Sequence, residues 1–127
     1  MKLPSIQIAD LLINAGLPWI DSDHIYTSNV TPDADTSGKA TFIRIQDADN
    51  TLKFFGNNMV SAISASVEIQ IFFSTDGNTN ILDAKVTVLN LLQRSGWLLK
   101  TVRPDTTDPD TKQKTVTIYV AKNLFIR

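Results

Sequence analysis

Hydrophobic and polar side chains alternate most clearly along residues 61–73, whose sequence is SAISASVEIQIFF. A period of two is typical of a β-strand that has one buried face and one face in contact with water. Antiparallel sheets permit this arrangement because one of their faces can stay solvated. The expected buried set is Ile63, Ala65, Val67, Ile69, Ile71 and Phe73, and the expected polar set is Ser64, Ser66, Glu68 and Gln70.

Residues 4–15 show apolar positions at helical spacing and predict a short helix. Pro4 suits the first turn of this helix, and Ser5 is a candidate cap for it. Gly16 follows the last apolar position and is expected to end the helix.

A second and longer helix is predicted over residues 80–95, where a narrow polar stripe faces a wide apolar sector. The width of that sector predicts a helix lying deep against a sheet. Asn80 and Asp83 have the spacing of a capping box, and Gly96 is placed where helices commonly end.

The remaining segments supply the other strands and the connections of the sheet. The run Asp47–Asn50 has the composition of a turn, residues 51–60 are ambiguous, and residues 29–39 read as a long exposed loop. Strands are predicted at residues 40–46, 97–103 and 115–121, with a further possible strand at residues 24–28.

Together these elements predict an α+β fold in one domain spanning residues 1–127. Its mostly antiparallel sheet of four to five strands would pack against two helices, in the order α-β-β-β-α-β-β.

Composition excludes several classes of function. The net charge is −1, which argues against nucleic-acid binding as the main role because little would drive counterion release from phosphates. The absence of cysteine excludes disulfides, thiolate metal sites and cysteine nucleophiles. Polar residues interrupt the N-terminal apolar stretch, and no run approaches the length of a membrane span. We therefore expect a cytosolic product.

Residues 103–115, RPDTTDPDTKQKT, are the segment whose composition most resembles a metal-binding or catalytic site. Asp105, Asp108 and Asp110 are candidate ligands for a divalent cation, since such ions take carboxylate oxygens. The alternative is a hairpin connection, because Pro, Asp and Thr are typical turn residues and proline cannot continue a sheet ladder. The absence of glycine and of a nearby histidine favours the hairpin.

Other catalytic or metal-binding patterns are weaker still. The run DADTSG at Asp33–Gly38 matches the start of a calcium-binding loop, but Arg44 stands where the closing glutamate belongs. His24 is the only histidine, and the chain has no nucleophile elbow of the type G-x-S-x-G. Glu68, the only glutamate, lies on the polar face of a strand. We therefore expect no enzymatic activity, no cofactor and no metal site.

Four motifs in order resemble a small family of tail-component proteins from siphophages of Gram-positive hosts. They are a V-E-I-Q-I-F strand, a helix ending near G-W, a D-P-D-T-x-Q turn and a last strand closing in V-x-K-N. In this chain they fall at Val67–Phe72, Gly96–Trp97, Asp108–Gln113 and Val120–Asn123.

That family is similar in size and element order to lambda-type tail terminators. The resemblance implies a homo-oligomeric ring, expected to be a hexamer, that caps the tail tube, stops its polymerisation and joins it to the head connector. The implied partners are other copies of the chain, the major tail tube protein and the head–tail connector protein, with DNA passing non-specifically through the lumen and no membrane. The alternative is another neck protein, an adaptor or a stopper.

The implied location is the tail or neck of the virion, after assembly in the host cytoplasm. A closed ring joins different patches of neighbouring copies, so interface residues are expected on the polar strand face and on the long loops. The candidates are Ser64, Ser66, Glu68, Gln70, Asp33, Asp35, Phe54, Phe55, Asp105, Asp108 and Asp110.

Overall fold

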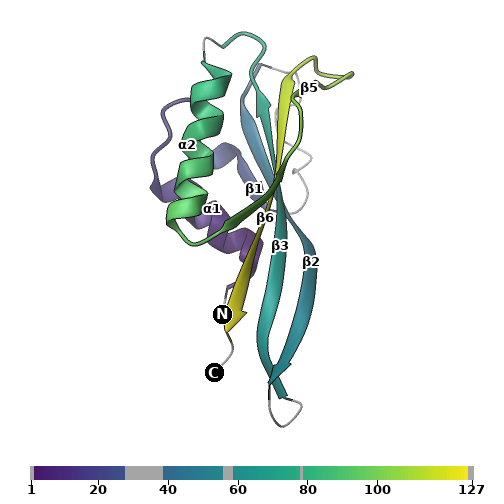
Figure 1. The fold of residues 1–127 in the computed structure, drawn as a ribbon. Coiled ribbons are helices and arrows are strands. Elements are labelled where there is room, and N and C mark those ends of the chain that lie inside the picture. The colour runs from purple at the N-terminus through teal and green to yellow at the C-terminus, as the bar shows by residue number, and fades with distance from the viewer. Residues whose placement is uncertain (1, 28–38, 56–58, 78, 126–127) are drawn as a thin grey trace.

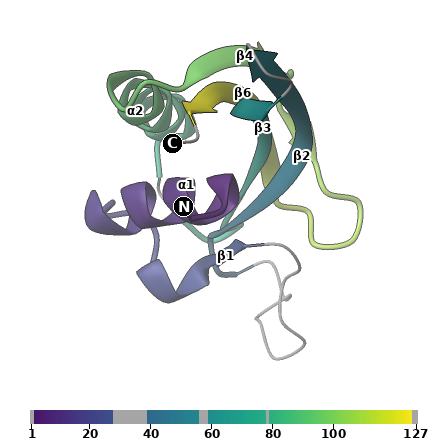
Figure 2. The same cartoon turned by 90° about the horizontal axis from the view of Figure 1, so that it is seen from below.

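One curved sheet with two helices on the same side forms the framework of the protein (Figure 1, Figure 2). The computed structural model describes residues 2–27, 39–55, 59–77 and 79–125. The elements are α1 (Pro4–Asn14), a 3-10 helix η1 (Ser22–His24), β1 (Ile25–Thr27), β2 (Phe42–Phe55), β3 (Met59–Phe73), α2 (Ile81–Arg94), β4 (Leu98–Val102), β5 (Thr106–Thr107) and β6 (Lys114–Phe125).

The strand order in the sheet is β1-β2-β3-β6-β4, and the short strand β5 pairs with β6. β1 runs parallel to β2, whereas every other pairing is antiparallel. The α+β class and the mostly antiparallel sheet backed by two helices are confirmed. The predicted number and order of strands are wrong, because the sheet has six strands and is mixed.

The extra strand, β5, lies inside the segment that the sequence assigned to a connection. Two threonines, Thr106 and Thr107, pair with Thr115 and Lys114 at the start of β6. Pro104 and Pro109 flank this two-residue strand, and neither can donate to a ladder, so the pairing stays short. The connection therefore folds back along β6.

β2 also differs from the expectation, since the predicted turn at Asp47–Asn50 lies within a continuous strand. A register shift between Asp47 and Asp49 marks a bulge at this place, so the turn-like residues are absorbed without ending the strand. The Asp47 carboxylate accepts hydrogen bonds from the backbone N–H of Ser5 at 3.1 Å and from its hydroxyl at 2.9 Å. This contact anchors the first turn of α1 to the sheet.

Ser5 is thus not the cap that its position suggested. The residue before α1 is Leu3, which makes no side-chain capping bond, and Pro4 occupies the first turn as expected. Ser5 itself is buried, and its donors are used by Asp47. Because the partner is 42 residues away in sequence, local pattern could not reveal it.

The alternation along β3 is confirmed between Ala65 and Phe73, where inward side chains are buried and outward ones are half-buried. It fails at the start of the strand, where Ala62 is buried and Ile63 is half-buried. There the strand runs beyond the helices, so the inner face is no longer covered in the same way (Figure 1).

α2 is capped as predicted, with the Asn80 side chain accepting from the Asp83 N–H at 3.1 Å. Gly96 has φ of 88°, the left-handed conformation that favours glycine after a helix. The predicted burial was too broad, because the helix buries only Ala84, Val88 and Leu92. No helix in the described part of the chain is long and apolar enough to cross a membrane.

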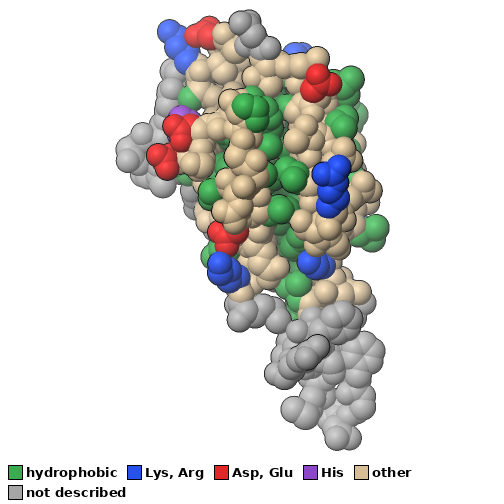
Figure 3. All heavy atoms as spheres, turned by 90° about the vertical axis from the view of Figure 1, so that its left-hand side faces the viewer, with side chains coloured by type: hydrophobic (Ala, Val, Ile, Leu, Met, Phe, Trp, Pro, Cys, Tyr) green, Lys and Arg blue, Asp and Glu red, His purple; other side chains and the backbone are tan. Residues whose placement is uncertain are grey.

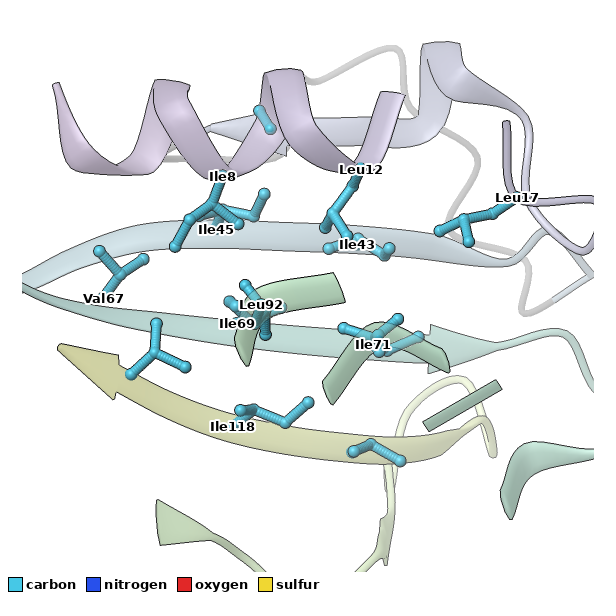
Figure 4. Packing of buried hydrophobic residues seen from close by; sticks show 14 of the residues in the cluster. Ile8, Leu12, Leu17, Ile43, Ile45, Val67, Ile69, Ile71, Leu92 and Ile118 are labelled. Atoms are coloured by element: carbon cyan, nitrogen blue, oxygen red, sulfur yellow. The ribbon is translucent and has the colours of Figure 1, made fainter. Parts of the chain in front are cut away.

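The core lies between the two helices and the inner face of the sheet (Figure 4). Ile45, Ile69 and Ile118 stand side by side across β2, β3 and β6, and all three are fully buried. Ile8 from α1 and Leu92 from α2 pack against this row. The row holds the sheet to the helices, and the outer face of the same strands carries the candidate site.

Candidate functional site

The outer face of β2, β3 and β6, opposite the helices, is the candidate interaction surface. No helix of the described residues covers it, because both helices lie on the other side of the sheet (Figure 1, Figure 2). The predicted polar residues of β3 all lie on this face and are half-buried among their neighbours in the adjacent strands. They are Ser64, Ser66, Glu68 and Gln70.

Glu68 lies at the centre of an ordered polar cluster on this outer face. Across the register, Glu68 pairs with Gln46 of β2 and with Tyr119 of β6. The Tyr119 hydroxyl donates to the Glu68 carboxylate at 2.6 Å, and the Arg103 guanidinium stands 5.3 Å from the centre of the Tyr119 ring. A charge-assisted hydrogen bond and a cation–π contact thus fix the tyrosine on the surface.

A second cluster lies one step along the same face. The Arg44 side chain donates to the side-chain oxygen of Gln70, which is its register partner. The Phe42 and Phe72 rings stack with centroids 4.4 Å apart. The Tyr26 and Phe42 rings form a T-shaped pair with centroids 6.3 Å apart. Stacked aromatic rings and a fixed arginine are residue types enriched where proteins contact one another.

The surface is hollowed beside the polar cluster. A shallow cavity of about 380 Å³ is lined by Ser66, Lys100, Thr101, Arg103, Tyr119 and Val120. A larger hollow of about 450 Å³ lies on the helix side, where Pro18 and Trp19 face the start of α2. The first hollow is the relevant one, because it adjoins the Glu68–Tyr119 pair.

The hydrogen bond to Glu68 raises the pKa of Tyr119, and burial and the glutamate charge add to this effect, whereas Arg103 opposes it. A raised folded-state pKa means that the bond stabilises the fold below about pH 10, the ordinary tyrosine value, and is lost as pH rises through the raised value.

We expect Glu68→Gln to lower the pKa of Tyr119, because the carboxylate that favours the neutral phenol is removed. Ultraviolet absorbance titration in a Tyr26→Phe background reports Tyr119 alone, since the chain has two tyrosines. Arg103→Gln should move the pKa in the opposite direction. A Tyr119 titration that both changes leave unmoved would contradict the described cluster.

The three aspartates of the segment after β4 do not converge on one point. Asp105 forms an ion pair with Lys85 of α2 at 2.8 Å, and Asp108 accepts from the N–H groups of Asp110 and Thr111 at 2.8 and 3.1 Å. Asp110 is exposed. No group of three potential ligands that could hold a metal occurs among the described residues. The segment is built as a folded connection.

Several predicted site residues lie wholly or partly outside the described structure. Asp33 and Asp35, and with them the calcium-loop-like run Asp33–Gly38, fall outside the described residues. The backbone of Phe54 and Phe55 pairs with Val60 and Met59 at the end of β2. Their expected interface role therefore stays a prediction.

Residues that complete the site were missed in the sequence. Tyr119 lay within the predicted strand 115–121, and Arg103 lay where the predicted strand 97–103 meets the segment 103–115, but neither was among the candidate site residues. Only the register between β3 and β6 brings these residues together, since Tyr119 is 51 residues from Glu68 and becomes its neighbour when the two strands pair. Sequence periodicity gives the face of each residue but not its neighbour on the next strand.

A family model described as "Protein of unknown function (DUF806)" matches residues 2–125 of the chain. No curated protein matches it.

Proposed function

We propose a structural role for this chain, which belongs to the DUF806 family of proteins of unknown function: it is a tail terminator of a siphophage. Copies of the chain form a ring, a hexamer in our proposal, on the end of the completed tail tube. The ring stops tube polymerisation and offers a surface to the head connector, while DNA passes through its lumen.

The observation that supports this role most strongly is the uncovered outer face of the sheet. Its side chains are held by specific contacts, with Tyr119 bonded to Glu68 and Arg44 bonded to Gln70. Immobilised side chains lose little conformational entropy on binding, so an ordered face is suited to forming a protein–protein contact. We assign this face to contacts with the tube or the connector.

The aspartates after β4 also support a role in protein–protein contact, in preference to a catalytic or metal-binding role. Asp105 is neutralised by Lys85, and Asp108 is used as a turn cap. Both carboxylates therefore have structural partners that fix the connection between β4 and β6. This connection lies at one end of the sheet, where it adds to the surface offered to the neighbouring virion component (Figure 1).

Phage particles that lack this protein test the proposal. A terminator limits polymerisation, so its loss should yield tails of abnormal length that do not join heads. A connector, adaptor or stopper acts after the tail is complete, so its loss should leave tails of normal length beside unattached heads. Electron microscopy of the lysate separates these results, and normal tails joined to heads would contradict any neck function.

A further inference from the structure

A bulge in β4 turns two successive side chains toward the outer face of the sheet. The register between β4 and β6 shifts between Leu99 and Thr101, so Lys100 is the extra residue at this place. Bulges re-aim side chains and recur beside functional sites. Lys100 and Thr101 both line the hollow of about 380 Å³ that adjoins Tyr119, which we call the β4 hollow. Regular alternation would have given the hollow only one of these two neighbours.

The charged side chains that the described structure places along the β4 hollow are both cations, Lys100 and Arg103. The two ion pairs of the described residues involve the lysines Lys2 and Lys85, so no described acid neutralises either cation of the hollow. Two like charges beside one hollow repel each other, and an anion between them relieves that repulsion. The β4 hollow therefore favours an anionic occupant.

This positive charge is local. The whole chain has a net charge of −1, and on the helix side of the molecule acidic side chains are interspersed with basic ones (Figure 3). Glu68, the acid beside the β4 hollow, already accepts a hydrogen bond from the Tyr119 hydroxyl at 2.6 Å. Charge complementarity thus selects an acidic partner for this part of the surface.

The hydrogen-bond donors around the β4 hollow are suited to a carboxylate. The Arg103 guanidinium stands 5.3 Å from the centre of the Tyr119 ring, whose hydroxyl Glu68 fixes in turn. The hydroxyls of Ser66 and Thr101 line the same hollow and can donate to an oxygen anion. A carboxylate accepts at two oxygens and forms its strongest hydrogen bonds with charged donors such as a guanidinium.

An exposed leucine beside the β4 hollow favours a peptide over a nucleic acid as the occupant. Leu98 is 62% exposed and lines a second hollow of about 250 Å³, which shares Lys100 with the first. A side chain of a peptide can cover this leucine and remove apolar surface from water. A phosphate backbone offers no such contact, and it binds through a series of cations along its length.

We infer that the β4 hollow binds an acidic segment of the tail tube protein, with one carboxylate between Lys100 and Arg103 and an apolar side chain of the same segment against Leu98. The inference rests on the proposed function, in which the tube end is the partner that a terminator contacts to stop polymerisation. It gives the outer face a defined chemistry, because the end of the tube must then present an aspartate or a glutamate to each copy of the chain.

Carbodiimide cross-linking of assembled tails tests the inference, because this reagent joins an amine directly to a carboxylate that contacts it. Lys100 should become joined to an aspartate or glutamate of the tube protein, and mass spectrometry identifies both residues. Lys100→Arg keeps the positive charge and removes the amine, so tails should still assemble and this cross-link should be lost. The ion pair of Lys2 with Asp10 at 2.8 Å supplies an internal control, since its cross-link should form in both tails.

Charge reversal gives a second measurement. Lys100→Glu should bind at least about tenfold more weakly than the wild type to tubes purified from a lysate that lacks the protein, because it places like charges at the contact. The matched control is Arg94→Glu, which reverses an exposed charge at the end of α2 and should bind as the wild type does. Co-sedimentation with the tubes measures binding, and circular dichroism verifies folding.

A Lys100 cross-link to the tube protein, together with weaker binding of Lys100→Glu alone, supports the inference. A Lys100 cross-link to the head connector or to a second copy of the chain overturns it. So does the absence of a Lys100 cross-link in tails where Lys2 and Asp10 are joined. Duplex DNA that binds the wild type but not Lys100→Glu would assign the hollow to phosphate, which also overturns it.

The proposed function is judged separately, by tail length in particles that lack the protein. Abnormal tails in those particles, combined with no cross-link from Lys100, would refute the acidic occupant and leave the terminator role standing. Tails of normal length would refute the terminator role itself.

Discussion

Replacing Ile69 by alanine is expected to lower the free energy of unfolding by about 3 to 4 kcal/mol, within the range found for buried isoleucine truncations. Ile69 is fully buried at the centre of β3, between Ile45 and Ile118 of the flanking strands. Close packing on both sides and the helices above leave the site little room to collapse (Figure 4). Urea denaturation followed by circular dichroism measures the change.

The matched control is Ile63→Ala on the same strand. Ile63 is half-buried where β3 runs beyond the helices, so the same deletion should cost only about 1 kcal/mol. Because small domains are stable by about 5 to 15 kcal/mol, only the Ile69 change removes a large fraction of the total. Equal losses at the two positions would contradict the placement of the core.

The second large effect concerns the outer face of the sheet. Ser66→Arg places a long cationic side chain at the hollow that Lys100 and Arg103 already line. The added bulk and charge should reduce the production of infectious particles at least about tenfold, because desolvated like charges at a contact cost several kcal/mol. A plaque assay in which the variant replaces the missing protein measures the effect.

The control for this change is Asn90→Arg, which makes the same type of substitution at an exposed position of α2. Circular dichroism should show that both variants are folded, since half-buried Ser66 and exposed Asn90 both lie outside the hydrophobic core. Full complementation by Ser66→Arg would show that the outer face makes no essential contact. Failure of both variants would mean that the effect is not specific to that face.

The elements that could be predicted are those whose signal is local. The alternation of β3, the capping of α2 by Asn80 and the glycine after α2 each depend on a few neighbouring residues, and each is confirmed. The predicted turn at Asp47–Asn50 was wrong because the structure there depends on pairing with a distant strand. Its residues favour a turn locally, but pairing with β3 carries the strand on through a bulge.

The candidate site divides in the same way. The face of Glu68 and Gln70 followed from period two, whereas their partners Tyr119 and Arg44 needed the alignment of three strands. The buried sector predicted for α2 was too wide, because periodicity does not reveal where the sheet beneath a helix ends. At the β4 edge no further strand of the described chain extends beneath the helix, so its flank stays exposed.

We propose that the outer face of the sheet is buried against another virion component, and the cysteine-free sequence allows a direct measurement of that burial. A single cysteine at Ser66 and, in a separate chain, one at Asn90 can be labelled with a thiol reagent, whose rate depends on access. We predict that Ser66→Cys reacts at least about tenfold more slowly in assembled tails than in the free protein, while Asn90→Cys changes little. Equal rates at Ser66 in the free and assembled states would contradict the account.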